Sequence, residues 1–111
     1  MTTKILVTGA SGFVGQHLLD RLFEYEDIKI NVVQFTDVSF PEAMVKKIDT
    51  IHPTSDFFGE SDKWYEDICR DIDLIFHLAW YVEPGNFLLS SKNLDCLIGT
   101  LRFAKAAAQA R

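Results

Sequence analysis

Three of the six glycines stand at a spacing that suits phosphate binding. Gly9, Gly12 and Gly15 lie between a short apolar run and an amphipathic segment. Gly9 permits a tight turn after a strand, Gly12 leaves room where a backbone must approach a phosphate, and Gly15 lets a helix press against a sheet. The N-terminus of that helix offers free N–H groups and a partial positive charge to an anion. The alternative interpretation is a close-packed turn that binds no ligand.

The segments on either side of the glycines predict the strand and the helix that this chemistry requires. Residues 4–8 are short, rich in branched side chains and followed by glycine, which is typical of a buried strand. Residues 13–25 predict an amphipathic helix. Its expected apolar stripe consists of Val14, Leu18 and Leu22, widened by Leu19 and Phe23.

The rest of the chain continues the alternation of strands and helices. We expect strands at 30–35, 48–52 and 73–79, and helices at 41–47, at 61–70 and from Ser90 or Ser91 to the C-terminus. This order predicts an α/β fold, a Rossmann-type doubly wound parallel sheet of about four strands. The expected apolar stripe of the last helix comprises Leu94, Leu97, Ile98, Leu101, Ala104 and Ala108.

Composition narrows the class of protein. The chain has 111 residues, 48% of them hydrophobic, and a formal net charge of −5. An acidic balance disfavours binding to nucleic acid or to an acidic membrane surface, because both need a positive protein surface. The two cysteines, Cys69 and Cys96, form no metal-binding pattern with the histidines and are interpreted as reduced core thiols of a cytoplasmic protein. We therefore expect no metal, no nucleic acid and no membrane.

Three segments together resemble one family. Val7-Thr8 before the glycines is similar to the TGxxGxxG signature of the short-chain dehydrogenase/reductase superfamily, and Gly12-Phe-Val-Gly15 looks like its extended branch. His77-Leu-Ala-Trp80 is similar to the H-x-A-A motif of that branch, and Asn93 before Gly99-Thr100 is similar to its asparagine helix. The resemblance is to the NAD-dependent epimerases and dehydratases that act on nucleotide sugars.

This resemblance implies the function. The chain is expected to be the NAD-binding, N-terminal half of a nucleotide-sugar epimerase or dehydratase, with residues 1–111 forming one Rossmann domain. The family's catalytic Tyr-x-x-x-Lys pair is expected beyond Arg111, so this chain alone should be inactive. Its one such spacing, Tyr25 to Lys29, falls at the wrong ends of the strands. A homodimer is possible, since family members often pair through helices.

Two alternatives to this function stay open. The first is an NAD(P)H-dependent reductase of the same branch that acts on sugar nucleotides or on carbonyl compounds. The second is a non-catalytic module that senses dinucleotides or binds partners through the same fold. The cofactor stoichiometry would distinguish the reductase, which consumes NAD(P)H, from the epimerase or dehydratase, which keeps its NAD. A parent protein that lacks the Tyr-x-x-x-Lys pair would favour the second alternative.

A carboxylate after the second strand indicates which cofactor binds. Asp37 follows Gly15 by 22 positions, where an acidic side chain can accept hydrogen bonds from the adenosine ribose and repel a 2′-phosphate. The first basic residue after it is Lys46. Both features favour NAD over NADP. The alternative interpretation of Asp37 is a solvated loop residue.

The remaining site residues follow from the fold and the resemblance. Leu78 and Ala79 should line the crevice at the end of a central strand. By resemblance, Asp56 and Phe57 touch the adenine, with Asp62 as an alternative and a helix cap as the other interpretation. Trp80 either walls the cleft or is a core or rim aromatic. Asn93 supports the site, and His77 is interpreted as structural. The predicted cofactor-binding set is Gly9, Ser11, Gly12, Phe13, Val14, Gly15, Asp37, Asp56, Phe57, Leu78, Ala79 and Trp80.

Overall fold

The computed structural model describes residues 2–36, 38–81, 85 and 88–110. Strands and helices alternate along them, as the sequence predicts. The strands are β1 (Thr3–Thr8), β2 (Ile28–Phe35), β3 (Thr50–Thr54) and β4 (Leu74–His77). The α-helices are α1 (Phe13–Leu22), α2 (Glu42–Val45), α3 (Asp62–Cys69) and α4 (Lys92–Gln109), and a short 3₁₀ helix, η1, spans Phe57–Gly59.

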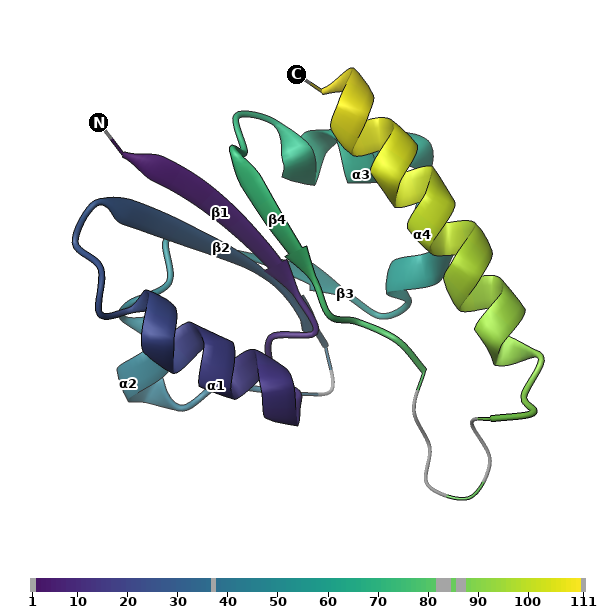
Figure 1. The fold of residues 1–111 in the computed structure, drawn as a ribbon, viewed down its shortest axis with the longest axis horizontal. Helices are drawn as coiled ribbons and strands as arrows, with labels where there is room; N and C mark the ends of the chain where they lie inside the picture. Colours follow the sequence, from purple (N-terminus) through teal and green to yellow (C-terminus); the bar gives the residue numbers. More distant parts are fainter. Residues whose placement is uncertain (1, 37, 82–84, 86–87, 111) are drawn as a thin grey trace. The chain divides into compact units, whose positions relative to one another are not determined.

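The four strands form one parallel sheet in the order β3-β2-β1-β4 (Figure 1). Ile5 pairs with Ile30 of β2 and with Leu74 of β4, so β1 lies between its two neighbours. Thr8 at the end of β1 lies opposite His77 at the end of β4. The predicted fold class, α/β with a Rossmann-type parallel sheet, is confirmed.

The chain divides into two compact units. We call residues 1–55 and 71–79 the sheet unit, because they contain all four strands with α1 and α2. Residues 56–70 and 80–111 form the helical unit, which contains η1, α3 and α4. The glycine loop belongs to the sheet unit.

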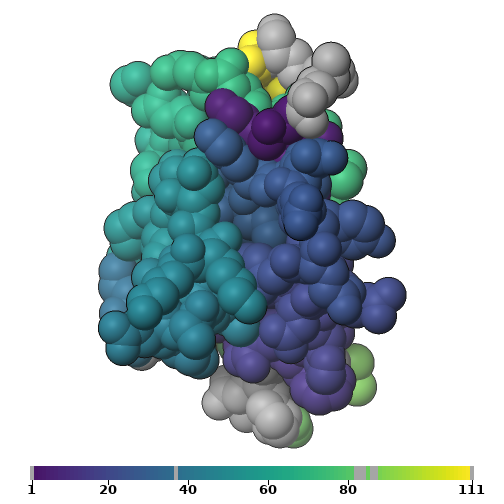
Figure 2. Space-filling view, turned by 90° about the vertical axis from the view of Figure 1, so that its left-hand side faces the viewer, coloured from purple at the N-terminus to yellow at the C-terminus, as the bar shows by residue number. Residues whose placement is uncertain are grey.

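The core of the sheet unit lies under α1 and α2. Figures 1 and 2 show these two helices side by side on one face, and the Lys47 ammonium lies 5.5 Å from the centre of the Phe23 ring beside them. The buried cluster comprises Ile5, Val7, Ala10, Leu19, Ile30, Val32 and Phe40. Burial of these apolar side chains is the main contribution to the stability of the layer formed by the sheet and the two helices.

The buried face of α1 differs from the predicted stripe. Gly15 and Leu19 are its buried residues, whereas Val14 is 62% exposed. Gly15 fixes this face, because a Cβ added there would lie 2.1 Å from the carbonyl oxygen of Gly9. The helix therefore presents its Gly15 side to the turn, and Val14, one residue earlier, is rotated by about 100° toward solvent.

The ends of several elements also differ from the prediction, for local reasons. Helix α1 ends at Leu22 rather than at 25, because Glu24 and Tyr25 donate to carbonyls three residues earlier, which tightens the last turn. Strand β3 spans 50–54 rather than 48–52 and includes Pro53, which has no N–H and is tolerated at the edge of a sheet.

Strand β4 ends at His77 rather than at residue 79. The Leu78 N–H donates to both the carbonyl oxygen and the hydroxyl of Thr8, at 3.1 Å each, and the Ala79 N–H donates to the same hydroxyl at 3.2 Å, so the backbone pairing ends in bonds to a side chain. This departure bears directly on the site described below.

An aromatic cluster forms the core of the helical unit. The Phe57 ring makes edge contacts with Phe58, Trp64, Tyr65 and Phe103, with centroid distances of 5.2–5.9 Å. The buried Tyr65 hydroxyl donates to the Phe57 carbonyl. Such pairs add to the stability gained from burial of the rings.

Helix α4 buries a face other than the predicted one. Its buried residues are Cys96, Gly99, Phe103 and Ala106. A Cβ on Gly99 would lie 2.8 Å from Phe58, so this small residue lets α4 approach η1 closely. The predicted stripe was wrong as a core face, because its larger members are 48–63% exposed: Leu94, Leu97, Ile98 and Leu101.

We expect Gly15→Ala to lower the free energy of unfolding by about 1–3 kcal/mol, because its Cβ would overlap the Gly9 carbonyl and the Ala10 backbone. Urea unfolding of the purified chain measures this change. The matched control is Gly12→Ala, whose Cβ would meet nothing nearer than 3.4 Å. Equal stability of the two variants would contradict the close approach of α1 to the turn.

Candidate functional site

The first glycine of the loop is held against the end of β4. Gly9 has a φ of +71°, which L side chains rarely adopt. A Cβ there would lie 2.7 Å from the Ala79 nitrogen and 2.7 Å from the Leu78 carbonyl carbon. The structure thus brings together Gly9, Leu78 and Ala79, three of the predicted site residues.

The second glycine occupies a different kind of place. Gly12 is the N-cap of α1 with an extended backbone, and a Cβ on it would touch only the Gly9 carbonyl oxygen, at 3.4 Å. Neither packing nor backbone conformation in the sheet unit requires glycine here. A side chain at Gly12 would instead fill the space in front of the helix N-terminus.

The N-terminus of α1 is left without a side-chain cap. Gly12 provides none, and the first turn contains no acidic side chain. By contrast, Ser61 caps α3 by accepting a hydrogen bond from the Trp64 N–H at 3.1 Å. The first N–H groups of a helix have no partner within the helix, so those of α1 suit an anion.

The other loop residues lie at the surface around this end. Ser11 accepts a bond from the Gln16 side chain on its carbonyl at 2.9 Å. Phe13 is 82% exposed, and its ring meets the His17 ring edge-on at 4.7 Å. Phe13 and Val14 are therefore available to a ligand rather than committed to the core.

A hydroxyl that our sequence interpretation missed joins the ends of β1 and β4. Thr8 is fully buried, and its Oγ1 lies 2.6 Å from Nδ1 of His77. The same oxygen accepts from the N–H groups of Leu78 at 3.1 Å and Ala79 at 3.2 Å. The signal in the sequence was a threonine and a histidine, each ending a strand, but only the register shows that they meet.

Burial of His77 lowers the pKa of its imidazole below the usual value. The hydrogen bond to Thr8 agrees with the interpretation of His77 as a structural histidine.

Asp37, predicted to bind the ribose, lies outside the described residues. Its neighbours are ordered by backbone bonds: Thr36 donates to the Thr54 carbonyl at 3.0 Å, and Val38 donates to the Phe35 carbonyl at 3.1 Å. The first of these bonds places Thr36 beside the end of β3. The role of Asp37 in binding the ribose stays a prediction.

Asp56 and Phe57 belong to the helical unit. Asp56 is exposed, and a Cβ on Gly59 would lie 2.2 Å from its carboxylate, so this carboxylate folds over η1. Phe57 is 1% exposed within the aromatic cluster, so its ring serves packing. Of the predicted adenine-binding pair, only Asp56 presents a side chain at the surface.

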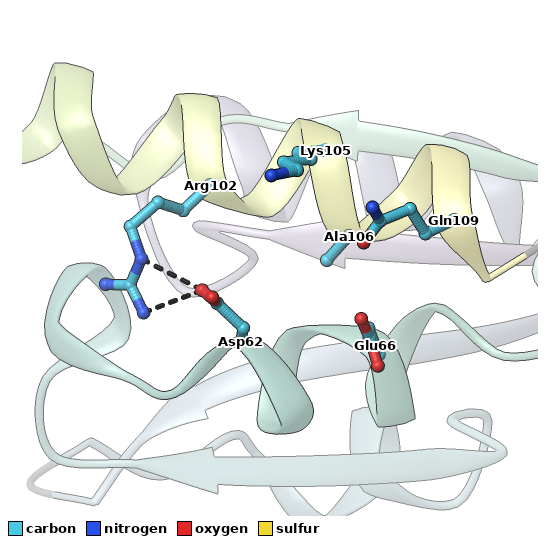
Figure 3. Close-up of a pocket in the computed structure, with 6 residues that line it drawn as sticks. All are labelled: Asp62, Glu66, Arg102, Lys105, Ala106 and Gln109. Carbon is cyan, nitrogen blue, oxygen red and sulfur yellow. Dashed lines mark hydrogen bonds and ion pairs between the residues drawn. The ribbon is translucent and has the colours of Figure 1, made fainter.

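Asp62, the alternative to Asp56, lines a groove between α3 and α4 and is hydrogen-bonded there to Arg102. Its carboxylate accepts a hydrogen bond from Nε of Arg102 at 3.0 Å (Figure 3). Arg102 also donates to the Glu60 carbonyl at 2.7 Å. This exposed pair contributes little to stability but fixes Asp62. The groove is lined by Asp62, Glu66, Arg102, Lys105, Ala106 and Gln109.

Trp80 and Asn93 are joined by a hydrogen bond. The indole N–H of Trp80 donates to Oδ1 of Asn93 at 2.7 Å, and the Asn93 amide donates to the Ser90 carbonyl at 3.2 Å. The Trp80 ring also meets Phe58 edge-on at 6.3 Å and is 42% exposed. Asn93 thus supports a half-exposed indole directly after Ala79.

The cysteines and the described helices give two further results. Cys69 and Cys96 are free and buried, and burial raises the pKa of the Cys69 thiol to about 11. No described helix has the length and apolar character needed to cross a membrane.

Curated relatives act on UDP sugars by name. The chain is 36% identical over 83 residues to the "Uncharacterized UDP-glucose epimerase YtcB" of Bacillus subtilis (strain 168), covering 68% of this chain and 26% of that protein. It is 31% identical over 81 residues to UDP-glucuronic acid decarboxylase 3 of Arabidopsis thaliana, covering 73% and 22%. The chain thus spans about a quarter of the length of these relatives.

Solved structures show the same fold. The terminal R domain from the myxalamid biosynthetic pathway superposes with a TM-score of 0.71 at 24% identity, over 99% of this chain and 32% of that one. UDP-glucuronic acid 4-epimerase from Bacillus cereus, in complex with a fluorinated UDP-glucuronic acid and NAD, gives 0.61 at 19% identity, over 97% and 36%.

A family model covers most of the chain. The sequence model described as the 3-beta hydroxysteroid dehydrogenase/isomerase family matches residues 6–100, which include the glycine loop, β4 and the start of α4. The chain therefore belongs to the 3-beta hydroxysteroid dehydrogenase/isomerase family, and its resemblance to extended short-chain dehydrogenases/reductases of the epimerase and dehydratase type is confirmed.

Proposed function

We propose that this chain binds NAD at the loop from Gly9 to Gly15, as the cofactor-binding portion of a nucleotide-sugar epimerase or dehydratase. The observation that carries the proposal is Gly12. Its missing side chain is not needed for packing, and it opens the space before an uncapped helix N-terminus. A glycine that the fold itself does not require is best explained by a ligand that does.

The residues present fit a dinucleotide. The first N–H groups of α1 would bind the pyrophosphate, and Gly12 would let it approach the backbone. Asp37 would accept bonds from the ribose, while Asp56 would lie at the adenine. Leu78, Ala79 and Trp80 would line the nicotinamide side, with Asn93 holding the indole in place. When bound, NAD supplies a hydride acceptor and donor for an epimerisation or elimination.

The chain supplies binding and orientation rather than proton transfer. Its one Tyr-x-x-x-Lys spacing, Tyr25 to Lys29, lies between α1 and the start of β2, whereas the glycine loop follows the end of β1. In a parallel sheet, the amino ends of the strands lie opposite their carboxyl ends. The Tyr25–Lys29 pair is at the amino ends and therefore cannot reach a cofactor bound at the loop. We therefore propose that this chain alone has no activity.

The substrate assignment rests on the curated relatives, which are named for UDP-glucose and UDP-glucuronic acid. The description of the matching family model instead names a dehydrogenase/isomerase, which favours an NAD(P)H-dependent reductase as the second candidate. An epimerase returns the hydride to its substrate and retains the cofactor. A reductase instead releases the cofactor in its oxidised form. Analysis of the cofactor after turnover by the whole protein separates these two functions.

The proposal extends to location and partners. The net charge of −5 disfavours binding to nucleic acid or to an acidic membrane. The free cysteines Cys69 and Cys96 favour a cytoplasmic protein. A homodimer is part of the proposal, because α4 leaves Leu94, Leu97, Ile98 and Leu101 exposed on one helix. An apolar face of this kind commonly marks a protein interface.

We expect Gly12→Val to weaken NAD binding by at least about tenfold, because its branched side chain would stand where phosphate oxygens must accept N–H groups. Isothermal titration calorimetry of NAD into the purified chain measures the affinity. The matched control is Glu24→Val, which adds the same side chain beyond the far end of α1. A folded Gly12→Val variant that binds NAD as tightly as the original chain would refute the phosphate site.

We expect Asp37→Ala to weaken NAD about tenfold and to reduce the preference for NAD over NADP, because the carboxylate binds ribose hydroxyls and repels a 2′-phosphate. Parallel titrations with NAD and NADP give this ratio. Asp20→Ala removes the same charge from an exposed position on α1 and should leave the ratio unchanged. An unchanged ratio in Asp37→Ala would make Asp37 a solvated loop residue.

A further inference from the structure

The Thr8 hydroxyl has a fixed set of partners at the ends of β1 and β4. A hydroxyl has one proton to donate and two lone pairs that accept. In this structure Oγ1 of Thr8 accepts from the N–H groups of Leu78 and Ala79, at 3.1 Å and 3.2 Å. The Leu78 N–H is shared with the carbonyl oxygen of Thr8, also at 3.1 Å, whereas the Ala79 N–H points at the hydroxyl. Both lone pairs of Oγ1 thus face N–H groups, an arrangement that directs the single proton toward the third neighbour, Nδ1 of His77, at 2.6 Å.

This arrangement determines the state of the imidazole. Because Thr8 donates, Nδ1 of His77 must accept, so the ring is neutral and carries its proton on Nε2. A doubly protonated ring has no acceptor at Nδ1. It would force the Thr8 proton onto the side of Leu78 and Ala79, where two N–H groups already point.

The hydrogen bonds reach the glycine loop through Ala79. Its nitrogen, held by Thr8, lies 2.7 Å from the place of a Cβ on Gly9. The position of the Ala79 backbone thus limits where Gly9 can lie, and Gly9 begins the turn that leads to Gly12. A shift of one backbone changes the position of the other, since no space separates them.

From these contacts we infer that His77 is a positioning residue for the dinucleotide: by accepting the Thr8 proton, it orients the hydroxyl that holds Ala79 against Gly9. The inference rests on the proposed function, because it assumes that the ligand occupies the Gly9–Gly15 loop. His77 itself needs no contact with the ligand, since it acts through Thr8 and Ala79.

The charged residue of the strand that pairs with β4 lies away from His77. Strand β4 pairs with β1, whose charged residue, Lys4, lies at the other end, where its N–H binds the Asp73 carboxylate at 2.9 Å. Burial alone lowers the pKa of His77 in the folded chain. Neutral His77 is therefore maintained at pH 7.5, and the Thr8 bond is lost only as the pH falls below the ordinary histidine value and through the lowered one.

The first experiment reads the tautomer directly and uses no ligand. Long-range ¹H–¹⁵N spectra of the chain show which ring nitrogen of each histidine carries the proton. His77→Asn identifies the signal, since His17 and His52 remain. We expect the Nε2–H form of His77 from pH 8 to below pH 6.5. An Nδ1–H form, or a charged ring at pH 7.5, would overturn the inference whatever the ligand.

The second experiment measures NAD affinity by calorimetry at pH 7.5 and pH 5.0, with folding checked by circular dichroism. Wild type should bind about tenfold more weakly at any pH where the first experiment shows a charged His77 ring, the effect of losing one buried hydrogen bond, and the lower pH is set there if the ring is still neutral at pH 5.0. His77→Asn should bind NAD like wild type at pH 7.5 but with no such loss, because its Oδ1 can accept the Thr8 proton and does not titrate. His77→Leu should bind about tenfold more weakly at both pH values.

Two further variants test the connection. Thr8→Ser keeps the hydroxyl and should keep the pH profile, which distinguishes it from a variant that merely disturbs packing. His52→Asn is the matched control: burial also lowers the pKa of His52, but it lies on β3, away from the loop. It should retain the wild-type profile.

The outcomes separate the inference from the proposed function. The same pH profile in wild type and His77→Asn would overturn the positioning role while NAD binding stands. No NAD binding at pH 7.5 by a folded chain with the expected tautomer would overturn the proposed function, and the role of His77 toward the dinucleotide with it.

Discussion

The Gly9 backbone is confined by two close neighbours, and the site depends on that constraint. Ala79 at the end of β4 leaves no room for a side chain on Gly9, and the Gly9 carbonyl leaves none for a side chain on Gly15. The loop therefore joins strand and helix with both backbones nearly in contact. The N-terminus of α1 takes its direction from this packing, so the space before Gly12 is a consequence of the glycines on either side.

The sequence predicted the elements better than their faces. All four strands and four α-helices lie where alternating apolar runs placed them, because each pattern is local. The faces depend on tertiary contacts. Gly15 turns α1 so that Val14 is exposed, and Gly99 meets Phe58 while the leucines of α4 face outward. Hydrophobicity alone predicts that the larger residues are buried, and the need for close approach reverses that choice.

The glycine loop was the predictable part of the candidate site, since its spacing within one turn specifies its geometry. The hydrogen bonds of Thr8 were not predictable in the same way. They require the register of β1 on β4, which places residues 69 positions apart within hydrogen-bond distance. Burial of the Phe57 ring likewise follows from how α3 and α4 meet, which no local pattern of the sequence reveals.

The two halves of the proposed function rest on different residues. Phosphate binding uses backbone N–H groups and missing side chains, so the loop has nothing with which to recognise a sugar or a steroid. Discrimination must come from side chains near the end of β4, and there the chain departs from the H-x-A-A motif by placing Trp80 after Ala79. Asn93 and Phe58 both contact that indole, so its orientation is fixed before any substrate arrives. A large, preoriented ring excludes some ligands by shape, so under the proposed function Trp80 would be the residue of this chain that selects among substrates.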